Sequence, residues 1–310
     1  MVFDVSLMSS TNLICLCVAL SATAAYVYAR SDTFPKKTGV PVLGTKAAKH
    51  SFELIDKVEI SEHVKRFRFA LPSFKFVLGL PIGKHITLSA MISNPLEEQG
   101  PTKYVARQYT PVTCDYTDAG YFDLVIKIYR KNEHPGYPEG GWMSQYLDAL
   151  PMGSFVDVKG PNGRLQYLGK NRFQIGHSPS IQCRHVAMIA GGTGVTPMYQ
   201  LIRYMTKMEK SPPGLSLVFG NQHPGDILLR PELENVPNLS LTLTVDRVDP
   251  GEKWSGFVGF VSAEMIRKAF PPPSTKGLLV FLCGPHPMIK SVESILVNDL
   301  GYPKSLIHTF

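Results

Sequence analysis

The hydrophobic pattern of this chain changes near residue 180, and that change limits what the chain can fold into. Between Val64 and Tyr167 apolar and polar residues tend to alternate, most clearly in the stretch YFDLVIKIYR. A period of two is typical of half-buried antiparallel strands, and turns containing Pro and Gly separate several such runs. This half of the chain therefore predicts a small antiparallel barrel with one helix, in MSQYLDAL.

After residue 180 the apolar residues form short continuous runs instead of alternating. The runs are HVAMIA, LSLVFG, LSLTLTV and GLLVFLC, accompanied by helical stretches such as TPMYQLIRYMTKM and PMIKSVESILV. Continuous apolar strands separated by helices are typical of a parallel sheet covered on both faces. In such sheets ligands bind beyond the carboxyl ends of the strands, so chemistry is expected just after AMIA and VFLC.

An uncharged segment begins the chain. No charged residue lies between Val5 and Ala29, and the stretch from Leu13 to Ala29 is mostly apolar and about long enough to cross a bilayer. Basic residues follow it, beginning with Arg30, whereas a cleaved signal peptide normally carries them in front. We therefore expect an uncleaved membrane anchor with the body facing the cytosol. A processed targeting peptide and an apolar helix lying against the body are the alternatives, and either the endoplasmic reticulum or the mitochondrial outer membrane would fit.

The organisation expected from these patterns is two domains behind a tethered anchor, a β domain followed by an α/β domain. A tether rich in Pro, Gly, Lys and Thr, without a sustained apolar period, follows the anchor. The expected segments are an anchor at 1–30, the tether at 31–50, the barrel at 51–170 and the parallel-sheet domain at 171–310.

Charge and cysteine content exclude several classes of protein. A net charge of +7 over 310 residues is modest, and Lys and Arg are not clustered with aromatic residues as in nucleic-acid binders. We therefore expect no nucleic-acid partner, whereas an acidic protein or an anionic lipid surface would suit the charge. The cysteines are odd in number and spaced like neither a zinc site nor a disulfide framework, so we expect no metal site and a reducing compartment. They are Cys15, Cys17, Cys114, Cys183 and Cys283.

The motif GGTGVTPM, residues 191–198, lies where the first parallel strand should end. Its glycines let the backbone pass close to a ligand, Thr196 can cap a helix, and Pro197 suits the first turn of that helix. A phosphate would fit at such a helix start. A tight strand-to-helix turn needs glycine even without a ligand, so both interpretations stay open.

The motif CGPHPM, residues 283–288, places the thiol of Cys283 at the end of another core strand. A buried cysteine is usually an inert small hydrophobe, and no partner motif for a nucleophile accompanies this one. Contact with a ligand is therefore the better hypothesis for Cys283.

Two further motifs offer groups for a phosphate and a ring. RQYTPV provides the guanidinium of Arg107, the ring of Tyr109 and the hydroxyl of Thr110. In GGWMSQYL, Gly140 and Gly141 precede a helix start, where their N–H groups could bind a pyrophosphate with help from the Ser144 hydroxyl. The alternative for the second motif is an ordinary glycine turn.

Eight segments taken together resemble a known family. RQYTPV, LVIKIY, GGWMSQYL, GPNGRLQY, GGTGVTPM, NQHPGDILLRPEL, CGPHPM and the terminal Phe310 occur in the order found in NADH-cytochrome b5 reductases. The resemblance covers about residues 50–310. It implies the fold of the wider ferredoxin reductase family, in which an FAD-binding barrel precedes a nicotinamide-binding α/β domain. It also implies that hydride passes from NADH to FAD and that single electrons then pass to cytochrome b5.

On the flavin side the resemblance implies roles for individual residues. Arg107 would neutralise the FAD pyrophosphate, Tyr109 would pack on the flavin, and Thr110 would hydrogen-bond near its central ring. His85 matches a histidine that the family links to the flavin threonine, although a purely structural hydrogen bond is the alternative. The further cofactor contacts implied are Gln108, Val125, Lys127, Gly141, Met143, Ser144, Thr196 and Pro197.

On the nucleotide side Asp246, at the end of LTLTVDR, matches an acidic residue near the adenosine ribose. A carboxylate accepts a hydrogen bond from a 2′-hydroxyl but repels a 2′-phosphate, so NADH should be preferred over NADPH. The residues implied to surround NADH are Gly192, Thr193, Cys283, Gly284, Pro285 and Met288. As candidate catalytic residues we take Thr110, His85 and Cys283.

The chain departs from the family pattern at two places. Trp142 stands where relatives often have lysine, which puts a basic contact to an acidic haem protein in doubt. Pro224 and Gly225 stand where relatives often have Glu and Lys, which makes the nucleotide-side loop less certain. Two alternatives therefore stay open: a related reductase serving another acceptor, and a membrane-tethered nucleotide-binding protein without turnover. Lipid contact through the anchor and a monomeric state complete the expectations.

Overall fold

The computed structural model describes residues 39–310 apart from 45–47, 98–99 and 134. The expected anchor, residues 1–30, lies outside the described residues, as does the first part of the expected tether. Within the part of the chain that is described, no helix is both long enough and apolar enough to cross a membrane.

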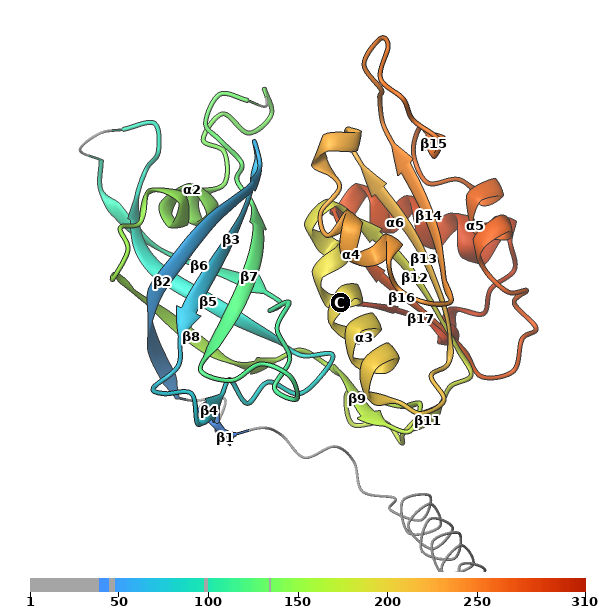
Figure 1. Cartoon of the computed structure of the whole chain (residues 1–310). Coiled ribbons are helices and arrows are strands. Elements are labelled where there is room, and N and C mark those ends of the chain that lie inside the picture. Colours follow the sequence, from blue (N-terminus) through green and yellow to red (C-terminus); the bar gives the residue numbers. More distant parts are fainter. Residues whose placement is uncertain (1–38, 45–47, 98–99, 134) are drawn as a thin grey trace, which may run out of the picture. The chain divides into compact units, whose positions relative to one another are not determined.

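The first domain is a six-stranded antiparallel sheet, as the alternating pattern predicted (Figure 1). Its strand order is β6-β5-β8-β2-β3-β7, so the edge strands β6 and β7 are not neighbours in the sheet and leave a seam. The inward side chains form an apolar core that includes Phe67, Phe69 and Phe122, and α2 packs Met143 and Leu147 onto that core. The elements are β2 (Lys49–Ser61), β3 (Val64–Ala70), β5 (His85–Ser93), β6 (Thr102–Tyr109), β7 (Tyr121–Lys127), β8 (Phe155–Asn162) and α2 (Trp142–Ala149).

A short parallel pair of strands brings residues of the expected tether onto this domain. Strand β1 (Val40–Pro41) pairs with β4 (Phe76–Val77), and the side chain of Leu43 is buried in the apolar core. The end of the expected tether is therefore packed, because it contributes apolar residues and backbone hydrogen bonds despite its Pro and Gly content. The segment boundaries themselves stay predictions.

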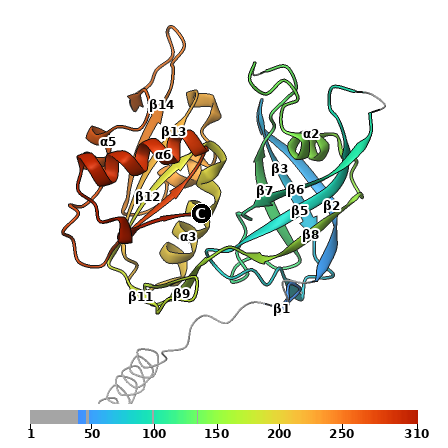
Figure 2. The same cartoon turned by 180° about the vertical axis from the view of Figure 1, so that it is seen from behind.

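The second domain is a six-stranded parallel sheet with helices on both faces, which confirms the interpretation of the continuous apolar runs. Successive residues of β12 pack alternately against α3 and α4 on one face and against α5 and α6 on the other. Helices α5 and α6 lie in front of the sheet in Figure 2, which views the molecule from the side opposite to Figure 1. The strands, in sheet order, are β15 (Phe257–Val258), β14 (Leu239–Val245), β13 (Gly214–Asn221), β12 (His185–Gly191), β16 (Leu278–Cys283) and β17 (Ile307–Thr309).

Four α-helices and several shorter helical turns accompany this sheet. The α-helices are α3 (Val195–Met208), α4 (Arg230–Glu234), α5 (Ala263–Ala269) and α6 (His286–Ser294). The turns are η2 (Gly192–Gly194), η3 (Pro224–Asp226), η4 (Ile295–Asp299) and η5 (Lys304–Leu306). A separate three-stranded sheet lies between the two large sheets in the chain: β9 (Leu165–Gly169), β10 (Arg172–Ile175) and β11 (Ile181–Gln182).

Strand β7 is buried on both faces, although its alternating pattern predicted a half-buried strand. Phe122, Leu124 and Ile126 point into the core of the first domain. Val125 points the other way and joins the apolar core of the second domain, so the face expected to be polar meets a neighbour. The two domains therefore share this strand as a common wall.

Candidate functional site

A cleft of about 470 Å³ lies along the seam between β6 and β7 and extends to the glycine loop of the second domain. That volume falls within the usual range for small-molecule and cofactor sites. The expected site residues that line it are His85, Arg107, Gln108, Tyr109, Thr110, Val125, Lys127, Gly141, Met143, Ser144, Gly192, Thr193, Thr196, Pro197, Cys283, Gly284 and Pro285. We call it the seam cleft.

Strand β6 ends in the charged and aromatic groups that RQYTPV predicted. Arg107 is exposed, and its Nη1 donates to the carbonyl of Ala106 over 2.8 Å, which holds the guanidinium at the edge of the seam. Tyr109 is partly buried against the core, and burial raises the pKa of its hydroxyl, so the ring is neutral. The side chain of Thr110 is buried. This edge offers one cation, one ring and one hydroxyl to a ligand in the cleft.

The start of helix α2 also lines the cleft, but its free donors are not those the sequence suggested. The N–H of Gly140 donates to Tyr137 and the N–H of Gly141 to Tyr129, so neither glycine amide is free for a phosphate. The Ser144 hydroxyl donates to the carbonyl of Gly141 over 3.0 Å. A helix cannot pair its own first-turn amides, so the donors for an anion are the N–H groups of residues 142–144.

The position of Gly141 shows why glycine stands there. A Cβ at Gly141 would lie 2.5 Å from the Ser144 hydroxyl oxygen and 3.1 Å from Cβ of Tyr129. Any side chain would therefore displace the Ser144 hydroxyl and crowd the side chain of Tyr129.

His85 lies in the same cleft at the start of β5 and is neutral near pH 7. Its burial, with a smaller contribution from the charge of Lys84, lowers the pKa of the imidazole below its ordinary value. A neutral imidazole offers one donor and one acceptor nitrogen. His85 and Thr110 both line the cleft, and the structural and flavin-linked interpretations of His85 both remain predictions.

On the opposite wall, the glycine motif forms the turn η2 before α3. Gly192 has a φ of +51°, in the left-handed region, and a Cβ there would meet nothing within 4 Å, so its outer side faces open space. Thr196 does not cap α3, contrary to the expectation, because the helix begins at Val195 and its N-cap is Gly194. The Thr196 hydroxyl instead donates to the carbonyl of Thr193 over 3.1 Å. Pro197 occupies the first turn, as predicted.

Cys283 ends strand β16 beside this turn. A Cβ on Gly194 would lie 2.3 Å from the Cys283 carbonyl oxygen, so only glycine allows the two backbones to approach this closely. Burial raises the pKa of the thiol to about 11, so it is protonated at neutral pH. The thiol therefore lacks the anionic form that a nucleophile needs.

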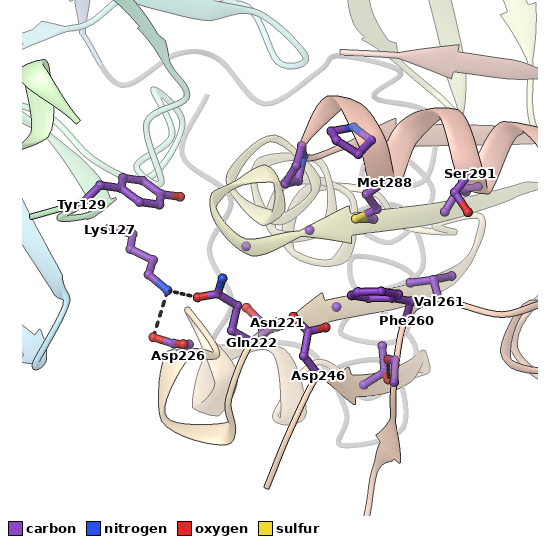
Figure 3. Close-up of a pocket in the computed structure, with 18 residues that line it drawn as sticks. Lys127, Tyr129, Asn221, Gln222, Asp226, Asp246, Phe260, Val261, Met288 and Ser291 are labelled. Carbon is purple, nitrogen blue, oxygen red and sulfur yellow. Dashed lines mark hydrogen bonds and ion pairs between the residues drawn. The ribbon is translucent and has the colours of Figure 1, made fainter. Parts of the chain in front are cut away.

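A second cleft, of about 550 Å³, lies at the carboxyl ends of β12, β13 and β14 (Figure 3). The remaining two expected site residues, Asp246 and Met288, line this one. Burial raises the pKa of the Asp246 carboxyl, while the Arg247 charge opposes that shift. We call this second cleft the strand-end cleft. The residues that line both clefts are Lys127, Tyr129, Gly191, Gly192 and Pro285.

At this shared wall an ion pair joins the two domains. Nζ of Lys127 lies 3.0 Å from Oδ1 of Asp226 and 3.5 Å from Oε1 of Gln222, contacts drawn in Figure 3. Lys127 comes from β7, whereas Asp226 and Gln222 follow β13. Lys127 was expected from the resemblance. Its two partners were not expected, because residue type alone does not indicate that they face Lys127.

Two other residues of the strand-end cleft were missed. Asn221, the last residue of β13, is buried, and neither its amide oxygen nor its amide nitrogen has a hydrogen-bond partner among the described residues. Phe260, a residue that is 83% exposed, also lines this cleft (Figure 3). The position of Asn221 at a strand end could have indicated a ligand contact. An exposed Phe in a loop gives no such indication.

One trio of described residues has the composition of a metal site: His223, Asp249 and Glu252. His223 Nδ1 accepts from the N–H of Gly225 over 3.2 Å, so in the neutral ring the proton is on Nε2. Nε2 lies 3.0 Å from Oε2 of Glu252 and 3.4 Å from Oδ2 of Asp249. The trio brings together the loops that follow β13 and β14.

The two departures from the family pattern have local explanations. The ring of Trp142 lies under the ammonium of Lys103, with Nζ 3.3 Å from the ring centroid, and its indole N–H donates to Glu139 over 2.8 Å. A positive charge therefore stands above the ring of Trp142. Pro224 begins the turn η3, and the N–H of Gly225 is bound by His223, so the loop is ordered by its own contacts.

Comparison with known proteins agrees with this two-domain arrangement. Residues 51–167 match the family described as oxidoreductase FAD-binding domain, and residues 188–294 match the oxidoreductase NAD-binding domain. The chain is 46% identical over 268 residues to NADH-cytochrome b5 reductase 2 of Xenopus tropicalis, covering 83% of this chain and 84% of that protein. It is 44% identical over 273 residues to the human protein of the same name, covering 85% and 95%.

A solved structure extends the agreement to three dimensions. The cytochrome b5 reductase domain of Ulva prolifera nitrate reductase superposes with a TM-score of 0.80 at 36% identity, covering 87% of this chain and all of that one. The fold, the paired clefts and these relatives together lead to one conclusion: the chain belongs to the NADH-cytochrome b5 reductase family.

Proposed function

We propose that this protein is a reductase that moves hydride from NADH to bound FAD and then passes single electrons to cytochrome b5 or a similar small haem protein. The observation that carries the proposal is the shared wall of the two clefts, where Lys127, Tyr129, Gly191, Gly192 and Pro285 line both. A dinucleotide in one cleft and a flavin in the other would meet at that wall. Bound FAD supplies the chemistry, because it accepts two electrons as hydride and releases them one at a time.

The seam cleft fits FAD. Arg107, near the end of β6, provides positive charge for a pyrophosphate, and the first-turn amides of α2 provide hydrogen-bond donors. Tyr109 provides a ring for stacking, and Val125 an apolar wall. We assign FAD binding to residues 51–170 and NADH binding to residues 171–310, with Thr196 and Pro197 reaching the flavin from the second domain.

The strand-end cleft fits NADH. Asp246 lies where a ribose hydroxyl could donate to it, and its carboxylate would repel a 2′-phosphate, which favours NADH over NADPH. Asn221 brings an unpartnered donor and acceptor to the same strand ends, and a bound nucleotide would satisfy them. Gly192, Thr193, Gly284 and Met288 would surround the nicotinamide half.

The side chains act by placing the reactants, because hydride transfer to a flavin needs no side-chain acid or base in its first step. Thr110 offers a hydroxyl from β6, and neutral His85 stands in the same cleft without adding charge. Cys283 remains a thiol, so it contributes contact rather than nucleophilic attack.

Stopped-flow absorbance tests the proposal. The full chain carrying FAD is mixed with NADH or NADPH and then with oxidised cytochrome b5. We expect rapid flavin bleaching with NADH, much slower bleaching with NADPH, and haem reduction afterwards. Bleaching without haem reduction would point to a different acceptor. A purified protein that holds no flavin would point to a nucleotide-binding protein without turnover.

We further propose that residues 1–30 anchor the protein in the endoplasmic reticulum or mitochondrial outer membrane, with the body facing the cytosol as a monomer. The support is the uncharged stretch before Arg30 and the basic residues after it. Flotation of the full chain and of residues 31–310 with lipid vesicles tests the anchor. Equal flotation would contradict it, and a dimer in sedimentation would contradict the monomer.

A further inference from the structure

Helix α3 presents a line of polar residues toward the flavin-side domain. Thr196, Gln200 and Arg203 are spaced four and three residues apart, which places them on one face of the helix. Thr196 lines the seam cleft. Gln200 and Arg203 lie further along the helix, and each binds a segment of the first domain that leads into the same cleft.

Gln200 binds the segment that precedes His85. Its side chain is almost fully buried, and Oε1 accepts the N–H of Gly83 over 2.7 Å. Gly83 has a φ of +89°, which residues with side chains rarely adopt, and it stands two residues before His85 at the start of β5. The backbone that leads into His85 is therefore held from the other domain.

Arg203 binds the segment that follows Thr110. Its Nη1 donates to the carbonyl of Val112 over 2.7 Å and lies 2.9 Å from Oδ2 of Asp118. Burial alone would raise the pKa of Asp118, but the N–H of Cys114 and the Arg203 guanidinium hold that pKa below its usual range. The carboxylate stays charged, which fixes Arg203 against Val112, two residues after Thr110.

We propose that Gln200 and Arg203 are positioning residues, which act from the nicotinamide-side helix to fix the backbone segments carrying His85 and Thr110. The inference rests on the proposed function and deepens it. Apolar contacts between domains are non-directional, whereas these bonds each select one backbone group and so set the register of the two domains. Hydride transfer depends steeply on that register, since a misplacement of about 1 Å can lower a rate about 100-fold.

The chain offers a matched control on the same helix. The Tyr167 hydroxyl donates over 2.7 Å to Oε1 of Glu209, which follows the end of α3. This bond has the same length as that of Gln200 and also joins α3 to a residue outside the parallel sheet. Neither Tyr167 nor Glu209 lines either cleft. Tyr167→Phe therefore removes this side-chain hydrogen bond, together with the one that the hydroxyl accepts from the N–H of Asn171, and leaves the backbone bond from the N–H of Tyr167 to the carbonyl of Ile82 in place.

The test compares Gln200→Met, Arg203→Met and Tyr167→Phe in the full chain carrying FAD. The first readout is the visible circular dichroism of the bound flavin, recorded before any nucleotide is added. The second is the flavin reduction rate at saturating NADH, with the NADH dissociation constant obtained from its concentration dependence. We expect both Met variants to alter the dichroism and to lower the rate about tenfold or more, with less than a twofold change in NADH affinity. Tyr167→Phe should match the wild type in all three.

Three outcomes would overturn the inference: unchanged dichroism and rate in both Met variants, equal losses in Tyr167→Phe, or a loss confined to NADH affinity. Gln200→Glu provides the rescue, because it keeps an acceptor oxygen at the same place for the N–H of Gly83. It should recover part of the rate, and failure to do so while FAD is retained would count against the inference. Failure of the proposed function and failure of this inference can be told apart. Flavin reduction by NADH in the wild type tests the proposed function. The dichroism of the variants is recorded without NADH and tests only the effect on the flavin environment.

Discussion

Lys127 of β7 and Asp226 of η3 form an ion pair across the domain boundary, with their charged atoms 3.0 Å apart and their side chains 13% and 14% exposed. Lys127 lines both clefts, whereas Asp226 lines only the strand-end cleft, so the pair lies beside the wall that the two clefts share. Asp226 neutralises Lys127 in the free protein. The carboxylate also places negative charge beside a ligand whose diphosphate is negative.

The two partners should therefore have opposite effects on nucleotide binding. Lys127→Met leaves a carboxylate without its cation and should weaken NAD⁺ binding about tenfold, or about 1.4 kcal/mol. Asp226→Asn frees the ammonium for the diphosphate and should tighten binding a few-fold. Calorimetric titration of the FAD-loaded protein at low and high salt measures both effects. Equal losses in the two variants would mean that the pair only joins the domains.

Arg107→Ala should release FAD. A charge-assisted hydrogen bond to phosphate contributes about 1.5 to 3 kcal/mol, so the dissociation constant should rise about 10- to 100-fold. The measurement is flavin content after dialysis. Arg172→Ala is the control, because that exposed arginine lies on β10 and lines neither cleft. Full flavin retention by Arg107→Ala would contradict the proposed role.

Asn221→Leu should separate binding from stability. The buried amide of Asn221 has no protein partner among the described residues, and such a group costs about 1 to 3 kcal/mol. Replacing it with an apolar group of similar size should leave the free energy of unfolding unchanged or raise it. NAD⁺ affinity should fall about tenfold, because a ligand would lose the amide. Chemical denaturation and titration decide, and a less stable variant with normal affinity would refute the prediction.

Acid should weaken the bond between Asp118 and Arg203. The pKa of Asp118 is lower in the folded protein than in the unfolded chain, so its contribution is fully present above the unfolded value of about 3.9. The contribution is lost as pH falls through the folded pKa, which lies lower still. At pH 7 Asp118→Asn should lower the free energy of unfolding by about 3 kcal/mol, since it leaves a half-buried guanidinium without its partner.

The measurement is urea unfolding of wild type and Asp118→Asn between pH 7 and pH 3. The difference between the two proteins should stay constant down to about pH 5 and narrow below about pH 4. A difference that is the same at every pH would show that the charge on Asp118 does not matter.

The fold could be predicted where local pattern and burial agree. The apolar runs HVAMIA and GLLVFLC form β12 and β16. A parallel strand that is covered on both faces needs apolar side chains at every position, so a continuous apolar run indicates it. The helix in MSQYLDAL was also found, as α2. Strand β7 was the exception, since its alternating sequence cannot reveal that Val125 meets a second domain.

The roles of the expected site residues stay predictions, although the structure brings many of these residues together. Arg107, Thr110 and Cys283 line one cleft because each follows or ends a strand whose position the fold determines. For Gly140 and Gly141 the sequence left open a pyrophosphate site or an ordinary glycine turn, and the structure pairs both amides with backbone carbonyls that the motif does not contain. Asn221 and Asp226 were missed for a related reason. The role of each residue depends on which groups lie next to it in the fold, and residue type alone does not predict those neighbours.

The sharing of β7 has a consequence for how the molecule unfolds. Phe122 and Leu124 belong to one apolar core and Val125 to the other, so a single strand closes both. If either core unfolds, β7 is lost from the other core as well. Scanning calorimetry should therefore record a single transition, and either half expressed alone should expose an apolar surface and aggregate. Evolution of this enzyme would accordingly have to alter β7 under two sets of packing constraints at once.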